Sequence, residues 1–119
     1  MEHHVRAAVA YVAGRVSGRH SSTVYDYNAG EYRSMSGTVT ESSISVYDYK
    51  AGCYLQGSCG GTGFNLYHYG QGAYVSFELN GSTFKGYDYG NGCYYQGTVN
   101  GSNISIYDYG EGAYFSYSV

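Results

Sequence analysis

The chain has 119 residues, with 18 Tyr, 19 Gly and neither Pro nor Trp, and its formal net charge is −3. This is the length of one domain. Only six residues are Lys or Arg, too few to grip nucleic acid through its phosphates, so we expect no nucleic-acid partner. The apolar run 7–13 is much shorter than a membrane span, so we expect no membrane insertion.

The cysteines and glycine-rich segments carry no sign of chemistry. Three cysteines, Cys53, Cys59 and Cys93, cannot all pair within one chain, and none lies at metal-ligand spacing. We therefore expect a reduced, cytoplasmic protein. The run 57–63 is rich in glycine but lacks the Lys that follows in a phosphate-binding loop. The sequence predicts a protein that is not an enzyme and has no cofactor and no metal.

An internal repeat organises the chain. Tyr-x-Tyr triplets begin at residues 25, 47, 67, 87 and 107, separated by 22 residues once and by 20 residues three times. A fixed period of this length predicts a repeat fold. Because 10–18 matches 93–101 in pattern, the repeats are expected to begin near residue 10. Residues 1–9 are then a short N-terminal extension, and 10–119 form a single β-hairpin-repeat domain.

Glycine-containing dipeptides predict tight turns at both ends of every strand. Asn-Gly at 80–81 and 100–101 and Gly60-Gly61 favour two-residue type I′ turns. At the other end, the pairs at 29–30, 51–52, 71–72, 91–92 and 111–112 place Gly second in each turn. The predicted strands are 10–16, 22–28, 32–39, 42–50, 53–59, 62–70, 73–79, 82–90, 93–99, 102–110 and 113–119.

The turns also predict a register. If 80–81 and 91–92 are two-residue turns, paired residue numbers sum to 161 in one hairpin and to 183 in the next. Each residue is then level with the one 22 positions later, which is two more than the repeat. A stagger of about one residue per strand is typical of barrels with tilted strands. We predict an all-β, antiparallel up-and-down meander of ten or eleven strands that forms a closed or flattened barrel.

A β-solenoid with one coil per repeat is the alternative architecture. It is less favoured because stacked coils would place Asp88 directly over Asp108, and because Asn-Gly favours hairpins.

Alternation along the strands assigns most tyrosines to the outer face. Sixteen of the 18 tyrosines are predicted there: Tyr11, Tyr25, Tyr27, Tyr32, Tyr47, Tyr49, Tyr54, Tyr67, Tyr69, Tyr74, Tyr87, Tyr89, Tyr94, Tyr107, Tyr109 and Tyr114. The predicted register makes cross-strand neighbours of Tyr49-Tyr54-Tyr67, Tyr69-Tyr74-Tyr87, Tyr89-Tyr94-Tyr107 and Tyr109-Tyr114. Ladder pairs stabilise a sheet, but this number of rings also indicates a contact surface.

The residue between the two tyrosines of each triplet is predicted to face inward at one mouth of the barrel. These residues are Asp26, Asp48, His68, Asp88 and Asp108. Each Asp can accept a hydrogen bond from a turn N–H. A ring of acids could instead hold a hard cation or select a cationic ligand, although alternate strands are about 10 Å apart, too far for shared coordination.

Two functions follow from these features. The first is a non-catalytic interaction module that presents the tyrosine-rich face for protein binding or self-association as a homo-oligomer. The second is a barrel that binds a small ligand or carbohydrate in its interior behind the acidic mouth. A filled interior favours the first, and an empty lumen favours the second.

Overall fold

The computed structural model describes residues 1–60 and 63–119. These residues form one helix and ten strands: α1 (His3–Val16), β1 (Thr23–Asp26), β2 (Glu31–Val39), β3 (Ser43–Asp48), β4 (Cys53–Gly60), β5 (Gly63–His68), β6 (Ala73–Asn80), β7 (Thr83–Asp88), β8 (Cys93–Asn100), β9 (Asn103–Asp108) and β10 (Ala113–Ser118). Each strand pairs antiparallel with the next, and β10 returns to β1, so the sheet is a closed barrel. The predicted up-and-down barrel is confirmed, and the solenoid is excluded.

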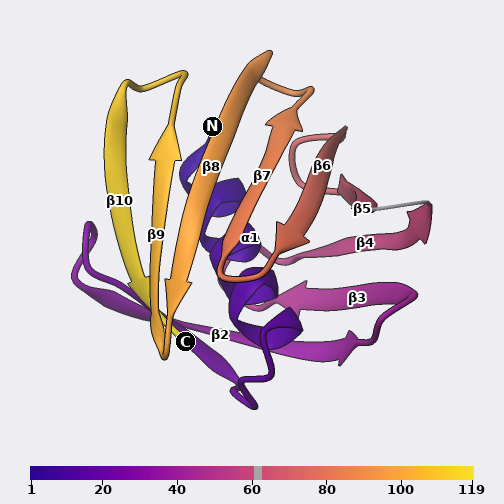
Figure 1. Cartoon of the computed structure of the whole chain (residues 1–119), viewed down its shortest axis with the longest axis horizontal. Coiled ribbons are helices and arrows are strands. Elements are labelled where there is room, and N and C mark those ends of the chain that lie inside the picture. The colour runs from indigo at the N-terminus through magenta and orange to yellow at the C-terminus, as the bar shows by residue number, and fades with distance from the viewer. Residues whose placement is uncertain (61–62) are drawn as a thin grey trace.

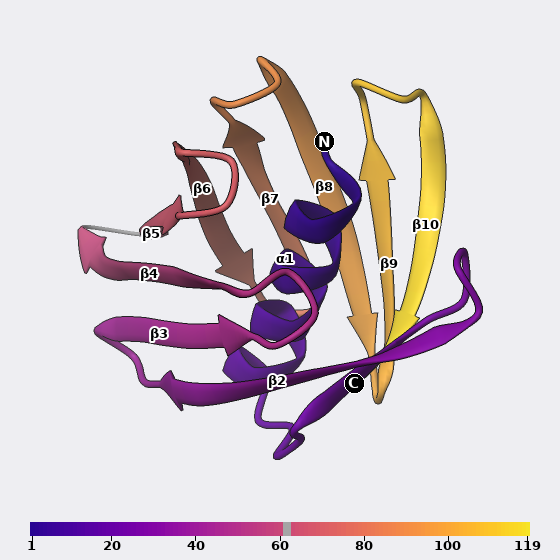
Figure 2. The ribbon, with the colours of Figure 1, turned by 180° about the vertical axis from the view of Figure 1, so that it is seen from behind.

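The segment 10–16, predicted to be the first strand, belongs to helix α1. The helix lies inside the ring of strands (Figures 1 and 2), and every residue from Val5 to Gly14 is buried. Its alanines favour a helix, and small side chains suit a narrow lumen. Because the barrel surrounds the helix, no polar stripe is needed. The prediction of an eleventh strand was therefore wrong, and an even number of strands lets β1 and β10 pair antiparallel.

The core is the layer between α1 and the inward side chains of the barrel. Along the strands, buried and more exposed residues alternate as predicted, with Val75 and Phe77 on the inside of β6. Near one end of α1, Gly14 lies so close to the side chain of Val119 that a Cβ at residue 14 would sit 2.6 Å from it. Helix and barrel therefore pack without space for larger side chains at that point.

The turns differ from the prediction at both ends of the barrel. Asn80 pairs with Thr83, so the two-residue turn is 81–82. Gly81 has φ 64°, and no described residue other than glycine has a positive φ, which is typical of type II′ rather than type I′. At the other end Asp88 pairs with Cys93 across a four-residue loop that ends in Gly92 (φ 66°). The predicted turn Gly60-Gly61 extends outside the described residues.

These turns reverse the predicted stagger. Paired residue numbers sum to 163 across β6 and β7 (Asn80 with Thr83) and to 181 across β7 and β8 (Asp88 with Cys93). Val75 pairs with Asp88, which pairs with Cys93, so residues 18 positions apart are level, not 22. The offset from the 20-residue repeat keeps its size, two residues per pair of strands, but has the opposite direction. The inference of a coiled, closing sheet is unaffected.

Candidate functional site

The acidic mouth lies where predicted, and its carboxylates cap the four-residue loops. Asp26, Asp48, Asp88, Asp108 and His68 are all buried. Asp108 Oδ1, for example, accepts the N–H of Gly110 at 2.9 Å and of Glu111 at 3.3 Å. The other three carboxylates also accept loop N–H groups through Oδ1. This bond explains why the loops have four residues, since it stabilises a wider turn.

The first residues of the chain fill the mouth and neutralise part of its charge. Asp108 Oδ2 accepts hydrogen bonds from the Met1 amino group at 2.9 Å and from Arg6 Nη1 at 3.0 Å. Burial alone would raise the pKa of Asp108, but the Met1 amino group and Arg6 outweigh it and hold that pKa below its usual value. The positive end of the α1 dipole lies at the same mouth.

A second buried ion pair lies within the barrel, between Arg33 on β2 and Asp48 on β3, and a hydrogen bond between Arg33 and His4 joins α1 to it. Arg33 Nη2 lies 2.6 Å from Asp48 Oδ2 and 2.6 Å from His4 Nδ1. Burial, together with the charge of Arg33, lowers the pKa of His4, so a neutral imidazole accepts from the guanidinium. Of the polar groups at this mouth, sequence reasoning identified the carboxylates but missed Arg6, Arg33 and His4. Nothing in the sequence indicated Arg6 and His4, because residues 1–9 were predicted to be an extension outside the repeats. Arg33 lies two residues before the inward Met35, so the alternation along β2 could have indicated its inward position.

His68 and Cys53 lie close together at the mouth but do not form an activated pair. His68 Nε2 is 3.9 Å from Cys53 Sγ, and His68 Nδ1 accepts the Gln71 N–H at 3.1 Å. Burial raises the pKa of the Cys53 thiol and lowers that of His68. Both shifts favour the neutral forms, whereas a nucleophilic cysteine needs a thiolate. Residues 1–60 and 63–119 contain no cluster of three or more His, Cys, Asp or Glu suited to a metal ion.

The outer tyrosines form five clusters of the same geometry, which we call triads. Each consists of the two tyrosines of a Tyr-x-Tyr triplet and the tyrosine five residues later, and in each the first ring contacts the other two in tilted, edge-on arrangements. In the triad of Tyr67, Tyr69 and Tyr74 the ring centroids are 4.8 and 4.9 Å apart. The other triads are Tyr25/Tyr27/Tyr32, Tyr47/Tyr49/Tyr54, Tyr87/Tyr89/Tyr94 and Tyr107/Tyr109/Tyr114.

The tyrosine predictions were correct about the face and wrong about the partners. Fifteen of the sixteen tyrosines predicted outside belong to the triads, but Tyr11 is fully buried because it lies on α1. The observed cross-strand partner of Tyr54 is Tyr47, and that of Tyr74 is Tyr67. The predicted partners differ by the two residues by which the register shifts. A shift of two leaves each side chain on its own face.

We call the surface formed by the five triads the tyrosine rim. Its second and third rings are exposed, from 45% at Tyr54 to 72% at Tyr32, while the first ring of each triad is half-buried beneath them. The rings lie at the same end of the barrel as the capped loops. Exposed aromatic rings with a hydroxyl offer apolar area and hydrogen bonding at low entropic cost.

Four grooves in the described outer surface repeat beside the triads. Groove A holds Tyr47, Tyr49, Tyr54, Ser36, Thr38 and Ser45, and groove B holds Tyr67, Tyr69, Tyr74, Gln56, Ser58 and Asn65. Groove C holds Tyr87, Tyr89, Tyr94, Ser76, Glu78 and Lys85, and groove D holds Tyr107, Tyr114, Gln96, Thr98 and Ser105. Their volumes are about 420, 570, 990 and 360 Å³. Each places tyrosines against the same three polar positions of the repeat.

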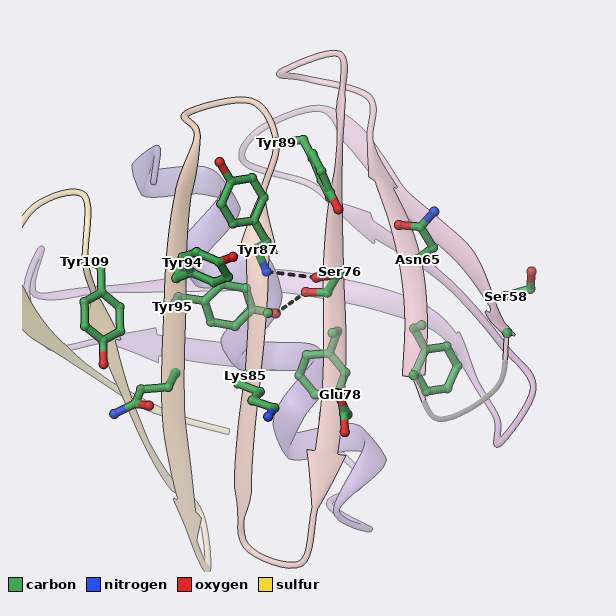
Figure 3. A pocket seen from close by; sticks show the side chains of 16 residues that line it. Ser58, Asn65, Ser76, Glu78, Lys85, Tyr87, Tyr89, Tyr94, Tyr95 and Tyr109 are labelled. Atoms are coloured by element: carbon green, nitrogen blue, oxygen red, sulfur yellow. Dashed lines mark hydrogen bonds between the residues drawn. The ribbon is translucent and has the colours of Figure 1, made fainter.

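Groove C is the largest, and its floor departs from a regular ladder. The pairing of β6 with β7 skips Ser76 and Phe77. The Tyr87 N–H donates instead to Ser76 Oγ at 2.8 Å, and the Tyr95 hydroxyl donates to the Ser76 carbonyl at 2.7 Å (Figure 3). Tyr95 reaches this carbonyl from β8 because the residue between them is Gly86. A Cβ there would lie 1.8 Å from the Ser76 carbonyl oxygen and 2.5 Å from the Tyr95 hydroxyl.

Comparison of the chain with protein-family models, curated proteins and solved structures gives no match. Within residues 1–60 and 63–119, no helix combines the length and apolar content needed to cross a membrane. Inference about function therefore depends on the tyrosine rim, the grooves and the filled interior.

Proposed function

We propose that this protein is a non-catalytic interaction module that presents its tyrosine-rich outer face for protein binding or self-association. One observation carries the proposal: the interior is occupied by the protein's own helix, while the tyrosines gather on the outside. A carrier needs an empty lumen, and the Arg6–Asp108 ion pair and the Arg33–His4 hydrogen bond hold α1 in that lumen. Contact with a partner would cover rings that otherwise stay in water.

The outer rings supply what an interface requires. Tyrosine is enriched at protein interfaces, whereas charged residues are depleted from their centres. The triads also fix the rings by mutual contacts before binding, so less side-chain entropy is lost. Ten exposed rings spaced around one end of a rigid barrel suit either a second copy of the chain or another protein.

The test is a triple variant, Tyr74→Ser, Tyr94→Ser and Tyr114→Ser, with Tyr→Phe at the same positions as the matched control. We expect the serine variant to lose oligomeric mass in sedimentation velocity, or to lose proteins that copurify with the parent, and to keep its β-sheet circular dichroism. The phenylalanine control should retain most association because it keeps the rings. A serine variant that melts earlier yet keeps the mass and the partners of the parent would contradict the proposal.

A second candidate, carbohydrate binding, is favoured by the polar lining of the grooves. It moves the predicted ligand site from the lumen to the outside of the barrel.

A further inference from the structure

The grooves beside the triads combine aromatic rings with neutral hydroxyl and amide groups. In groove A the polar side chains are Ser36, Thr38 and Ser45, and in groove B they are Gln56, Ser58 and Asn65. Neither groove is lined by a charged side chain. A purely apolar ligand would strip water from these groups without replacing its hydrogen bonds. A polar, uncharged ligand would suit these grooves best.

The polar groups select further among uncharged ligands. A Ser, Thr or Tyr hydroxyl both donates and accepts, and an amide side chain does the same through two atoms. Sugar hydroxyls have this double character, and the C–H faces of a pyranose ring can pack on an aromatic ring. In groove A the hydroxyls of Ser36 and Tyr49 already share a hydrogen bond of 2.9 Å, which a ligand hydroxyl could join or replace.

Other polymers fit the grooves less well. A nucleic acid needs cations along its backbone, and grooves A and B supply none. A peptide that adds a strand needs an open sheet edge, and the sheet closes between β1 and β10. A polyproline peptide docks in aromatic grooves, but its prolines have no backbone N–H to donate. It could accept hydrogen bonds from the Ser, Thr, Asn and Gln side chains of the grooves, and the acceptor oxygens of those side chains would stay unpaired.

The spacing and size of the repeated grooves indicate what size of ligand each can hold and how the ligand would be displayed. Equivalent grooves lie two strands apart, about 10 Å between backbones, with the tyrosine tips further apart on the convex outer face. A volume of about 420 or 570 Å³ is within the range of small-ligand sites. Several shallow sites on one rigid scaffold gain strength by multivalency when the ligand is displayed densely.

We infer that grooves A and B bind neutral saccharides, one short stretch of sugar in each, and that the barrel is a multivalent carbohydrate-binding module. This inference rests on the proposed function in one respect, since it takes the outer tyrosines as the contact surface. It adds the chemistry of the partner: a neutral glycan, free or attached to a larger molecule. Grooves C and D share the same frame, and the charged side chains of Glu78 and Lys85 line both.

The experiment uses the full chain against maltohexaose, cellohexaose and N-acetylchitohexaose, each immobilised at high density and each titrated in solution. Polygalacturonate and decaproline are the charged and peptide comparators. In amide-detected NMR titrations we expect at least one neutral sugar to shift resonances of Asn65, Ser58 or Ser45, with weak affinity per site and stronger retention on the dense surface. The comparators should leave these resonances unchanged.

Variants separate the sugar site from the rim as a whole. Tyr74→Ala removes an exposed ring of groove B, whereas Tyr32→Ala removes an exposed ring that lines none of grooves A to D. We expect Tyr74→Ala to weaken sugar binding in groove B about tenfold and Tyr32→Ala to change it less than about twofold. Asn65→Leu leaves every ring in place, so it should reduce sugar binding severalfold without reducing any self-association.

Three results would overturn the saccharide inference. Equal losses from Tyr32→Ala and Tyr74→Ala, or no shift with any of the three sugars up to about 10 mM, would overturn the inference. Binding of decaproline alone would also overturn it and assign the grooves to a peptide. If the sugars fail while the Tyr74, Tyr94 and Tyr114 serine variant still loses association, the proposed function stands and only the saccharide inference falls.

Discussion

The ion pair at the mouth of the barrel leads to a prediction about how α1 is held inside it. In Asp108→Asn the side-chain oxygen can still accept the loop N–H groups of Gly110 and Glu111, so the turn remains capped. The change replaces only the oxygen that faces Arg6 and the Met1 amino group with an NH₂ donor. The substitution thus separates the charge of residue 108 from its role in the turn.

The cost follows from burial. The side chain of Asp108 is fully buried and that of Arg6 is only 9% exposed, so the guanidinium cannot recover water when its partner is lost. Removing one member of a buried ion pair costs roughly 3–5 kcal/mol. We expect urea denaturation followed by circular dichroism to show a fall of this size in the free energy of unfolding. The m-value, the slope of that free energy against urea concentration, should be unchanged.

Asp26→Asn is the matched control. Asp26 has the same place in its repeat and caps its loop through Oδ1 in the same way, but Oδ2 lies 3.5 Å from His3, whose side chain is 39% exposed. We expect a loss below about 1 kcal/mol there. Adding Arg6→Met to Asp108→Asn should restore part of the stability. Equal losses at residues 26 and 108 would refute the role assigned to the ion pair.

The same ion pair makes a prediction for pH. The folded pKa of Asp108 is lower than its unfolded value, so its contribution to stability is present above the unfolded pKa, about 3.9, and is lost as the pH falls through the folded pKa. The gap in unfolding free energy between the parent and Asp108→Asn should therefore narrow in acid. A gap that stays constant down to the acid limit of folding would contradict this account.

Three further predictions concern other parts of the barrel. Gly86→Ala should destabilise by several kcal/mol in urea titrations because a Cβ meets the Ser76 carbonyl, whereas Tyr95→Phe should cost only about 1–3 kcal/mol for one lost hydrogen bond. Tyr67→Ala should lower stability about twice as much as Tyr69→Ala, since the first ring contacts two others and the second contacts one. Burial raises the pKa of Tyr117 to about 12. The contribution of Tyr117 to the free energy of unfolding is therefore complete below the unfolded pKa near 10 and is lost between pH 10 and 12. Ultraviolet titration of the parent against Tyr117→Phe would detect this late ionisation.

The sequence was sufficient to predict the strands and their faces because both depend on alternation with a period of two. An error of two residues in the turns left these assignments intact, so the inward position of Asp88 and the outward position of Tyr74 were predicted correctly. The pairings were wrong because they depend on the position and length of each turn: the two-residue turn is 81–82 rather than 80–81, and the loop 89–92 has four residues rather than two. The Asp that caps each loop changed that length, and only its hydrogen bonds in three dimensions show this.

Helix α1 was missed for a different physical reason. A helix inside a barrel is surrounded by apolar side chains, so it lacks the polar stripe that marks an amphipathic helix. Val12 and Val16 also fit the strand pattern of later repeats. The grooves could not be predicted either, because each combines residues from several strands. The stagger that places Gln56 opposite Tyr67 in groove B was predicted in the opposite direction.

The position of α1 also constrains how this chain can fold. The barrel closes by pairing Tyr25 with Ser118 and Asp26 with Tyr117, contacts that span most of the chain, and α1 must be inside before that seam forms. A helix of 14 residues is marginal in water by itself, and a ring of strands without it has nothing to pack around. The two therefore have to be completed together, in a transition dominated by distant contacts, which predicts slow folding for a chain of this size. During synthesis α1 is made before the strands, so it would have to wait for β10 before reaching its final place.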